Sequence, residues 1–327
     1  MLNTLRFILD HPLNRGHAAR AIGRYLRWQV GARLLPVPHV MPFVDDTVLV
    51  MERGMTGATG NWYCGLHEFA DMGFVLHFLR DGDLFVDIGA NVGSYTVLGA
   101  GAVGARTVSF EPVPGTFAKL ERNIAANRLG RLVEAHNVGL SSRDETLRFT
   151  AGRDTVNHVV SGDIDEATVE VPVKRLDDVL AGAVPRLVKL DVEGWEAEVL
   201  DGMPATLADP LLAAIITETN HSAGRYDNAG EDRVSMTMRA HGFTAYSYDP
   251  FARALVAGGS HYNTIFARDL DFVRDRLARA PERRYVISGT SGMVDFSVSQ
   301  LATLSGWGTS LAISLSSDES VSAIFLR

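Results

Sequence analysis

The residues with the clearest chemical pattern lie in the run Phe85–Gly93, FVDIGANVG. An apolar stretch reaches an acid, Asp87, and turns through glycines, which predicts a strand and a tight turn into a helix. Gly89 lets the backbone approach a ligand closely, and the helix start offers amide groups to an anion. Asp87 can meet a cation. The turn therefore suits a ligand with both charges close together, such as an amino-acid moiety; the alternative is a turn without ligand.

A second acid follows the next apolar stretch, Thr107–Phe110. Glu111 is expected at the tip of the second strand, where a doubly wound fold holds ribose hydroxyls, and Pro112 fixes the chain beyond it. The alternative is a surface carboxylate that caps the next helix. Together the two features favour ligand binding.

The glycine pattern disfavours a dinucleotide. A pyrophosphate site needs G-x-G-x-x-G between strand and helix, whereas this turn reads D-x-G-x-x-x-G and Asp87 would repel a phosphate. A literal G-x-G-x-x-G at Gly99, Gly101 and Gly104 precedes the second strand, which is the wrong context. A nicotinamide-dependent oxidoreductase is therefore a disfavoured alternative to an enzyme with another cofactor. A catalytically inactive cofactor-binding module is the second alternative.

A third group follows the apolar run Leu187–Leu190. Lys189 and Asp191 are two residues apart, so in a strand they share a face and can pair. Glu193 is expected to open the next helix, where a negative charge is favourable. The block is then either an ion pair with a helix start or a catalytic site at Asp191, and one residue can serve both.

Two weaker polar clusters occur at Asp154–His158 and Glu218–His221. Asn157 and His158 could contact an acceptor, with His158 as a general base. An isolated histidine is more commonly a structural group. No cluster has the ligand spacing of a metal site, so no metal is predicted; the alternative is that one acid pair, together with substrate oxygens, holds a magnesium ion.

The elements that must position these residues follow from hydrophobic periodicity. Apolar runs that alternate with helical patterns predict a mostly parallel, doubly wound sheet. The expected strands are 84–88, 107–110, 132–138, 187–190 and 213–217, with helices at 95–102 and 116–127. Leu147–Thr150 and Val169–Val173 indicate an inserted hairpin. Thr244–Tyr248 and Thr264–Ala267 indicate a closing antiparallel pair.

The N-terminal segment differs in charge from the rest. Residues 1–33 contain six arginines and one acid. Apolar residues at helical spacing predict a helix with Arg20, Arg24 and Arg27 on another face; these apolar residues are Ala18, Ile22, Tyr25 and Leu26. The preferred interpretation is a capping helix with a solvated basic face. The alternative is a contact for an anionic substrate or a membrane surface.

Composition bounds the function class. The chain has 327 residues, 46% of them hydrophobic, which is ample for a buried core. Its net charge of −8 argues against general nucleic-acid binding. The single cysteine, Cys64, excludes an intrachain disulfide. Neither a signal peptide nor a long apolar span is visible, so we expect a cytoplasmic protein without stable membrane insertion.

Three motifs in order resemble the FkbM family of S-adenosylmethionine-dependent methyltransferases. They are Asp87–Gly93, Phe110–Pro112 and Lys189–Gly194, and the resemblance runs from about Gly65 to Arg268. Many methyltransferases share the first motif, whereas the third, followed by Glu196 and Val199–Leu200, is much more specific.

The resemblance implies a Rossmann-like class I methyltransferase fold. This α/β fold has a mostly parallel seven-stranded sheet with helices on both faces, here with an N-terminal helical extension and an inserted β-hairpin. We expect a helical or extended cap at 1–64 and the S-adenosylmethionine-binding domain at 65–280. Residues 281–327 form a Ser-rich appendage of uncertain order and unassigned role.

The resemblance also implies residue roles. The loop that holds the methionine end of S-adenosylmethionine matches Asp87, Gly89, Asn91 and Gly93. Glu111 matches the ribose-binding acid, Asn137 lies near the expected adenine, and Asp191 lies beside the expected sulfonium. The implied reaction is O-methylation of a hydroxyl on a small molecule, glycan or natural-product intermediate, with His158 or Asp191 as the base. Nucleic acid is not an expected partner.

Overall fold

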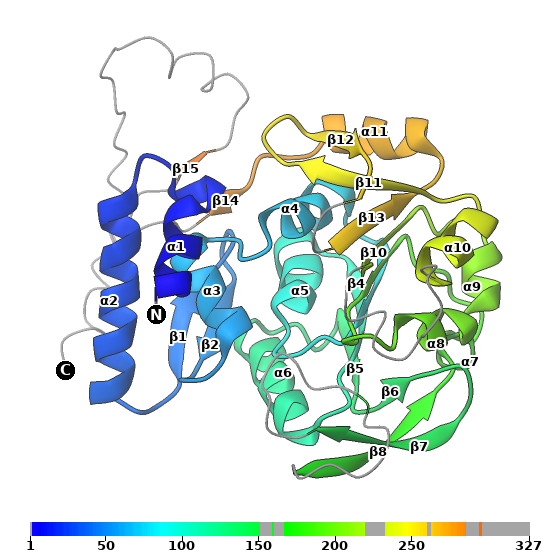
Figure 1. Ribbon diagram of the computed structural model, residues 1–327, viewed down its shortest axis with the longest axis horizontal. Coiled ribbons are helices and arrows are strands. Elements are labelled where there is room, and N and C mark those ends of the chain that lie inside the picture. Colours follow the sequence, from blue (N-terminus) through cyan, green and yellow to red (C-terminus); the bar gives the residue numbers. More distant parts are fainter. Residues whose placement is uncertain are drawn as a thin grey trace.

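A central eight-stranded sheet forms the core of the protein. The structure, a computed structural model, describes residues 2–150, 159, 167–219, 233–259, 263–285 and 294–295. In spatial order the strands are β12 (Ala254–Ala257), β11 (Thr244–Asp249), β13 (Asn263–Ala267), β10 (Ala214–Glu218), β9 (Leu187–Leu190), β3 (Leu84–Ile88), β4 (Arg106–Phe110) and β5 (Val133–His136) (Figure 1). The five strands from β10 to β5 run parallel, and the other three are antiparallel.

The sheet confirms the predicted architecture. All seven expected strands are present, including the closing antiparallel pair β11 and β13. β12 is an eighth strand that was not predicted; it pairs with β11 through a short hairpin in which Asp249 lies opposite Ala254. The direction of strand succession reverses between β3 and β9, which are neighbours in the sheet.

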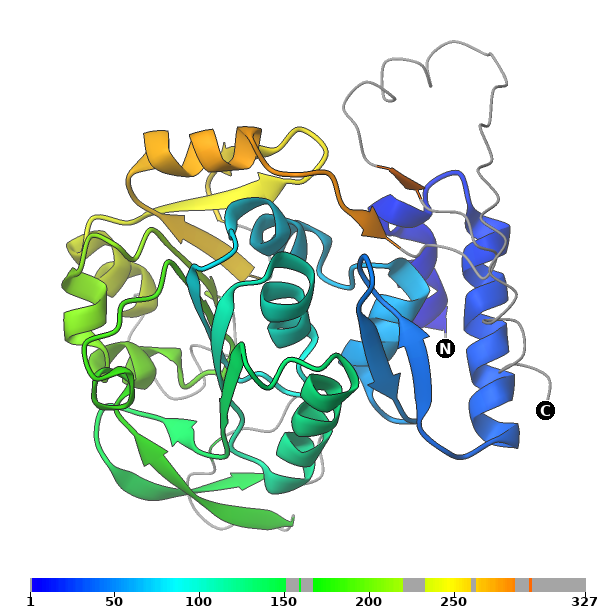
Figure 2. The same ribbon diagram turned by 180° about the vertical axis from the view of Figure 1, so that it is seen from behind.

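Helices cover both faces of the sheet (Figure 1, and Figure 2 from behind). One face carries α4 (Phe69–Phe78), α5 (Ser94–Thr96) with its continuation η2 (Val97–Val103), α6 (Pro114–Ala126) and α11 (Leu270–Ala278). The other carries α7 (Leu176–Leu180), α8 (Glu196–Asp201), α9 (Pro204–Ala208) and α10 (Arg233–Ala240). Because both faces are covered, β3 and β9 are almost continuously apolar. Among the described residues, no helix has the length and apolar character to cross a membrane.

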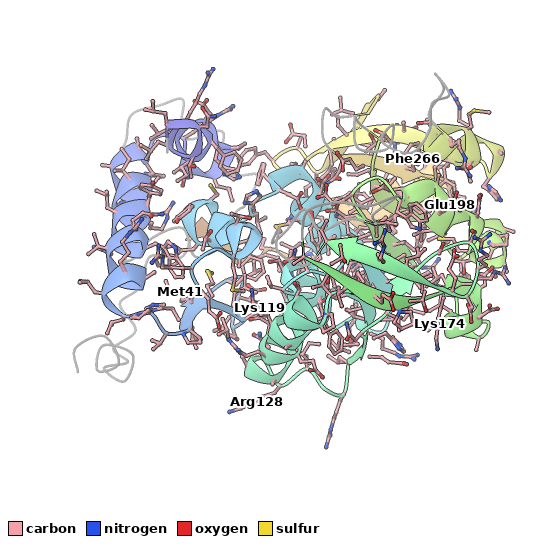
Figure 3. The ribbon with its side chains drawn as sticks, turned by 60° about the horizontal axis from the view of Figure 1, so that its bottom comes forward. Met41, Lys119, Arg128, Lys174, Glu198 and Phe266 are labelled. Carbon is pink, nitrogen blue, oxygen red and sulfur yellow. The ribbon has the colours of Figure 1, made fainter. Side chains whose placement is uncertain are left out.

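The N-terminal segment packs against the helical face that includes α6. It comprises α1 (Leu2–Asp10), η1 (Pro12–Asn14), α2 (Ala18–Leu34), β1 (His39–Pro42), β2 (Val48–Met51) and α3 (Thr56–Cys64). Asn123 of α6 and Asn127, which directly follows α6, accept hydrogen bonds from the backbone amides of Val50 and Val48, at 2.7 and 2.8 Å. In Figure 3, the labelled Met41 of β1 lies between α2 and the labelled Lys119 of α6. The segment therefore shares one hydrophobic core with the sheet.

The expectation of a solvated basic face on the N-terminal helix is wrong for Arg24. Its side chain is only 1% exposed. The guanidinium donates to the Tyr63 carbonyl at 2.7 Å and to Oδ1 of Asn14 at 2.5 Å. Burial lowers the pKa of this guanidinium. Arg24 thus joins α2 to the end of α3 and to η1, while Arg20 and Arg27 lie exposed.

The predicted inserted hairpin is also confirmed. β7 (Glu145–Thr150) and β8 (Thr168–Lys174) pair antiparallel, and β6 (Gly139–Leu140) joins β8 to give a small separate sheet. The expected acceptor contact and base, Asn157 and His158, lie outside the described residues. Of the Ser-rich appendage, the structure describes 281–285, including β14 (Arg284–Tyr285), and β15 (Val294–Asp295), which pairs with β14.

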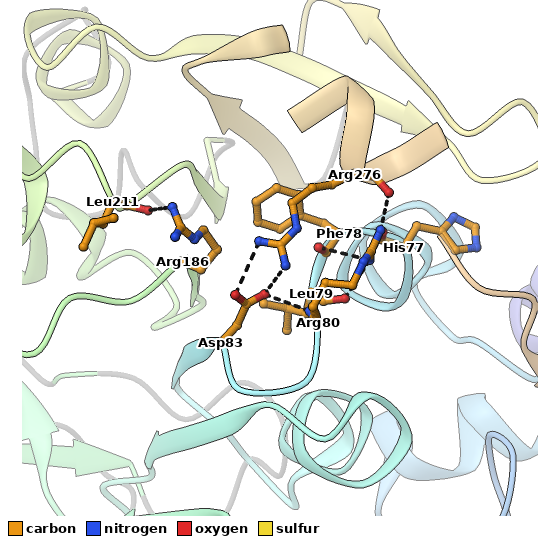
Figure 4. A network of polar contacts seen from close by, with 8 residues as sticks. All are labelled: His77, Phe78, Leu79, Arg80, Asp83, Arg186, Leu211 and Arg276. Carbon is orange, nitrogen blue, oxygen red and sulfur yellow. Dashed lines mark hydrogen bonds and ion pairs between the residues drawn. The ribbon is translucent and has the colours of Figure 1, made fainter. Parts of the chain in front are cut away.

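A polar network ties α11 to the amino end of β3 (Figure 4). Arg276 of α11 pairs with Asp83 at 2.5 Å, directly before β3. Arg80 donates to the carbonyl oxygens of His77 and Leu79, both at 2.8 Å, and to that of Arg276. This network lies at the opposite end of β3 from the glycine turn, so it supports the sheet rather than the ligand-binding edge.

Candidate functional site

Three of the predicted motifs meet at the carboxyl edge of the sheet. The turn Gly89–Gly93 follows β3, Glu111 follows β4, and Asp191 follows β9. Strand order reverses between β3 and β9, and open α/β sheets bind ligands in the crevice at such a switch point. The fold therefore brings the predicted polar residues to the position where a ligand is expected.

Gly89 makes the close approach of two loops possible. Its φ is +76°, and a Cβ atom there would lie 1.9 Å from the carbonyl oxygen of Asp191. The amides of Gly89 and Ala90 both donate to the carbonyl of Phe110, at 3.0 and 2.9 Å. Only glycine combines a positive φ with the absence of a Cβ atom, and the two hydrogen bonds fix the turn between β4 and β9.

Glu111 is a buried carboxylate that holds the same turn. Its side chain is 6% exposed, and its two oxygens accept from the backbone amides of Asn91 and Val113, each at 3.0 Å. Burial raises the pKa of Glu111 to about 7, although these two hydrogen bonds oppose the shift. Each carboxylate oxygen keeps a second lone pair that can accept from a hydroxyl.

Asn137 lies against the loop that follows β4. Its side-chain amide donates to the carbonyl oxygens of Glu111 and Pro112, at 2.8 and 2.9 Å. The residue thus anchors the loop after β4. Its expected contact with adenine stays a prediction.

Asp87 lies inside β3 rather than on the surface of the turn. It is 1% exposed, and its Oδ2 accepts from Oγ1 of Thr96 at 2.6 Å. The Thr96 hydroxyl is also 2.8 Å from Oγ of Ser109 on β4. Burial raises the pKa of Asp87 to about 6. When it is ionised, Asp87 thus places a negative charge at the end of β3, directly before the turn.

The predicted pairing of Lys189 with Asp191 is confirmed. Nζ of Lys189 lies 2.8 Å from Oδ2 of Asp191 and 5.1 Å from the centre of the Tyr95 ring. Burial of Lys189 opposes its charge, but the carboxylates of Asp191 and Glu68 outweigh this effect and raise the pKa of the ammonium group. About a third of the Asp191 side chain, 34%, is exposed. It is therefore held in place and still accessible.

The expected helix start at Glu193 is wrong. Glu193 has φ of +54° and Gly194 has φ of +100°, so both lie in a tight turn before α8 begins at Glu196. Right-handed helix requires negative φ, which excludes both positions. The buried carboxylate of Glu196 accepts from the amides of Val192 and Gly194, at 3.2 and 3.1 Å, and so closes the turn.

Four polar side chains that sequence reasoning missed extend the site. The Tyr95 hydroxyl donates to Oε2 of Glu68 at 2.7 Å. The Asn263 amide on β13 donates to Asp71 at 3.0 Å and to Oε1 of Glu68 at 3.3 Å. Burial and the Glu68 charge raise the pKa of Asp71 to about 7. Tyr95 lies in the first turn of the helix after Gly93, which was the one available sequence signal.

The charge balance of this edge fits a cationic ligand. Four carboxylates, from Glu68, Asp71, Asp87 and Asp191, surround the ammonium group of Lys189. Buried carboxylates without enough countercharge have raised pKa values, and a nearby cation stabilises their ionised form. A ligand with a sulfonium and an ammonium group meets this condition, and Glu111 supplies an acceptor for its ribose. In the described part of the chain, no group of acids, histidines and cysteine has the arrangement of a metal site.

Comparison with known proteins agrees with the geometry. The methyltransferase FkbM domain matches residues 87–245. Methyltransferase 1 of Beauveria bassiana is 32% identical over 175 residues, which cover 46% of this chain and 69% of that protein. The 31-O-demethyl-FK506 methyltransferase FkbM of Streptomyces tacrolimicus is 29% identical over 215 residues, covering 54% and 79% of the two chains.

A further relative is the hexuronic acid methyltransferase AglP of Haloferax volcanii. It is 32% identical over 138 residues, which cover 41% of this chain and 55% of that protein. The matched domain begins at Asp87 and includes the turn, Glu111 and the Lys189–Asp191 pair. The chain is a methyltransferase of the FkbM family, and its methyl donor is S-adenosylmethionine.

Proposed function

We propose that this methyltransferase methylates a hydroxyl oxygen on a sugar or a natural-product intermediate. The names of two relatives support this acceptor class, since one refers to hexuronic acid and the other to an O-demethyl form of FK506. The observation that carries the proposal is Asp191. Its partly exposed carboxylate, held by Lys189, stands at the switch point beside the Gly89 turn.

The residues around the turn fit S-adenosylmethionine. In this proposal Asp87, Gly89, Asn91 and Gly93 hold the methionine end, and Glu111 accepts from the ribose hydroxyls. Asn137 is assigned to the adenine in the same proposal. When bound, S-adenosylmethionine supplies a methyl group activated by a positively charged sulfur.

Asp191 is proposed to orient the reacting groups. Lys189 occupies its Oδ2, and Oδ1 can accept from an acceptor hydroxyl or from the cofactor's ammonium group. Holding the acceptor oxygen in line for attack can supply much of the rate. The hydroxyl must also lose its proton, and the proposed bases are His158 and Asp191. An imidazole titrates near ~6.5, which suits a base at neutral pH.

Calorimetry and a product assay test the proposal together. Purified protein should bind S-adenosylmethionine and its demethylated product, and it should release that product with a panel of uronic acids, hexoses and macrolide alcohols. Asp191→Asn should weaken cofactor binding and lower turnover. Turnover with RNA but with none of the hydroxyl acceptors would overturn the proposed acceptor class. Unchanged binding and turnover in Asp191→Asn would remove its assigned role.

A further inference from the structure

Exposed apolar side chains are concentrated in the N-terminal segment. Of the twelve large apolar side chains that are exposed in the described residues, nine lie within residues 2–40. Three of them are on α2: Leu26, Val30 and Leu34 are 54%, 55% and 75% exposed. Residues four apart lie on the same face of a helix, so these three form one stripe. Isolated exposed apolar residues need no explanation, but a contiguous stripe does.

Arginines border this stripe on both sides. At 3.6 residues per turn, Leu26, Val30 and Leu34 span about 80° of the helix surface. Arg33 lies about 20° before Leu26, and Arg27 lies about 20° beyond Leu34, with Arg20 about another 20° farther. All three arginines are exposed. The buried residues of α2 occupy the opposite side: Ala21, Arg24, Tyr25, Trp28 and Ala32.

The stripe lies on the outer side of the described part of the chain. Among the described helices and strands, α2 is the outermost at its end of the structure, with α1 and α3 between it and the sheet (Figure 1). Side chains extend from α2 away from the body as well as toward it (Figure 3). The chain after α2 continues the apolar surface with Leu35, Val37 and Val40, which are 61%, 56% and 59% exposed.

We propose that the outer face of α2 binds the surface of an anionic lipid bilayer. An apolar stripe with a basic border is the pattern of helices that lie in the membrane interface. The stripe would enter the boundary of the acyl chains, while the long arginine side chains reach lipid phosphates. Such binding is peripheral and leaves the carboxyl edge of the sheet open to its ligands.

The charge distribution favours this occupant over a second copy of the chain. Residues 1–33 carry 6 − 1 = +5, so the rest of the chain carries −8 − 5 = −13. An anionic surface attracts the first part and repels the second, which orients the molecule with α2 toward the lipid. α2 contains four arginines and no acid. Two copies packed through this face would place their arginines together without countercharge.

Vesicle flotation tests the proposal with the full-length protein. Wild-type protein should float with vesicles of 30% phosphatidylglycerol in phosphatidylcholine, and much less with phosphatidylcholine alone. The variant Leu26→Gln/Val30→Gln/Leu34→Gln should lower the partition coefficient about 100-fold, as expected from the apolar surface that it removes. Arg20→Gln/Arg33→Gln should lower the partition coefficient about 30-fold on anionic vesicles, and high salt should lower that of the wild type in the same direction.

A matched control uses the three exposed apolar residues outside this segment, changed as Leu211→Gln/Met236→Gln/Val256→Gln. This control should float like the wild type, and the stripe variant should bind S-adenosylmethionine normally. Wild-type protein that does not float, or a stripe variant that floats equally well, would overturn the proposal. A wild-type protein that is dimeric in sedimentation equilibrium, with a stripe variant that is monomeric, would also overturn it, because the stripe would then join two copies. Crosslinks from position 30 to residues 296–327, without flotation, would assign the face to the chain's own C-terminus.

Discussion

The carboxylate of Glu111 should make the stability of the protein depend on pH in a defined way. Its pKa is about 7 in the folded chain, against 4.5 as the ordinary value. Between these two pH values the unfolded chain loses the proton while the folded chain keeps it. The folded state therefore binds more protons, and the free energy of unfolding falls as the pH rises through this window. This difference in pKa contributes about 3 kcal/mol to the free energy of unfolding. The contribution is fully present below about pH 4.5 and is lost above about pH 7.

The variant Glu111→Gln cannot titrate at this position. One of its two side-chain atoms must face a backbone amide as a donor, because Asn91 and Val113 both donate to the carboxylate. Whatever stability the substitution itself costs at pH 5, the free energy of unfolding of the variant relative to the wild type should rise by about 2.5 kcal/mol between pH 5 and pH 8. For a chain of 327 residues, that change corresponds to about 4 °C in melting temperature. The same variant should bind S-adenosylmethionine about 10- to 100-fold more weakly at pH 8, because hydrogen bonds to a charged group contribute ~1.5–3 kcal/mol.

Thermal melts from pH 5 to 8 and calorimetry at pH 8 measure the two effects separately. Glu196→Gln is the matched control, since burial also raises the pKa of Glu196 to about 7 but its carboxylate holds the turn after β9. Glu196→Gln should change the pH profile of stability in the same direction, and it should leave the dissociation constant of S-adenosylmethionine unchanged because Glu196 does not face the ribose. Parallel pH profiles for wild type and Glu111→Gln would refute the buried ionisation. An unchanged dissociation constant would refute the ribose contact.

Three further predictions concern other charged groups. Lys189→Met should lower the free energy of unfolding by about 3–5 kcal/mol at pH 7 in urea titrations, because it leaves buried carboxylates without their countercharge; a loss below 1 kcal/mol would contradict this. Arg24→Met should cost roughly 2–4 kcal/mol by the same assay, since two buried acceptors lose their donor, whereas exposed Arg20→Met should stay within about 0.5 kcal/mol. His158→Ala should spare cofactor binding and lower turnover roughly 10²–10⁴-fold on a confirmed acceptor, and near-full turnover across pH 6–9 would exclude His158 as the base.

The sequence by itself determined the parts of the protein that depend on local spacing. Apolar runs between helical patterns predicted the seven strands, because strands buried on both faces need continuous apolar residues. The Gly89 turn depends on backbone conformations within a few residues, and Lys189 and Asp191 share a face because side chains alternate along a strand. The order of the three motifs was enough to identify the family.

Only the tertiary structure decided which distant groups meet. Glu68 and Asn263 are 195 residues apart, and the hydrogen bonds of Asn263 to Glu68 and Asp71 form only because folding brings the start of α4 to β13. Periodicity assigned Arg24 to solvent because a charge is costly to bury, yet Asn14 and the Tyr63 carbonyl supply acceptors that only folding brings together. A local pattern shows where a side chain points along its own element. Whether it meets water, a partner or another charge depends on elements far away in the sequence.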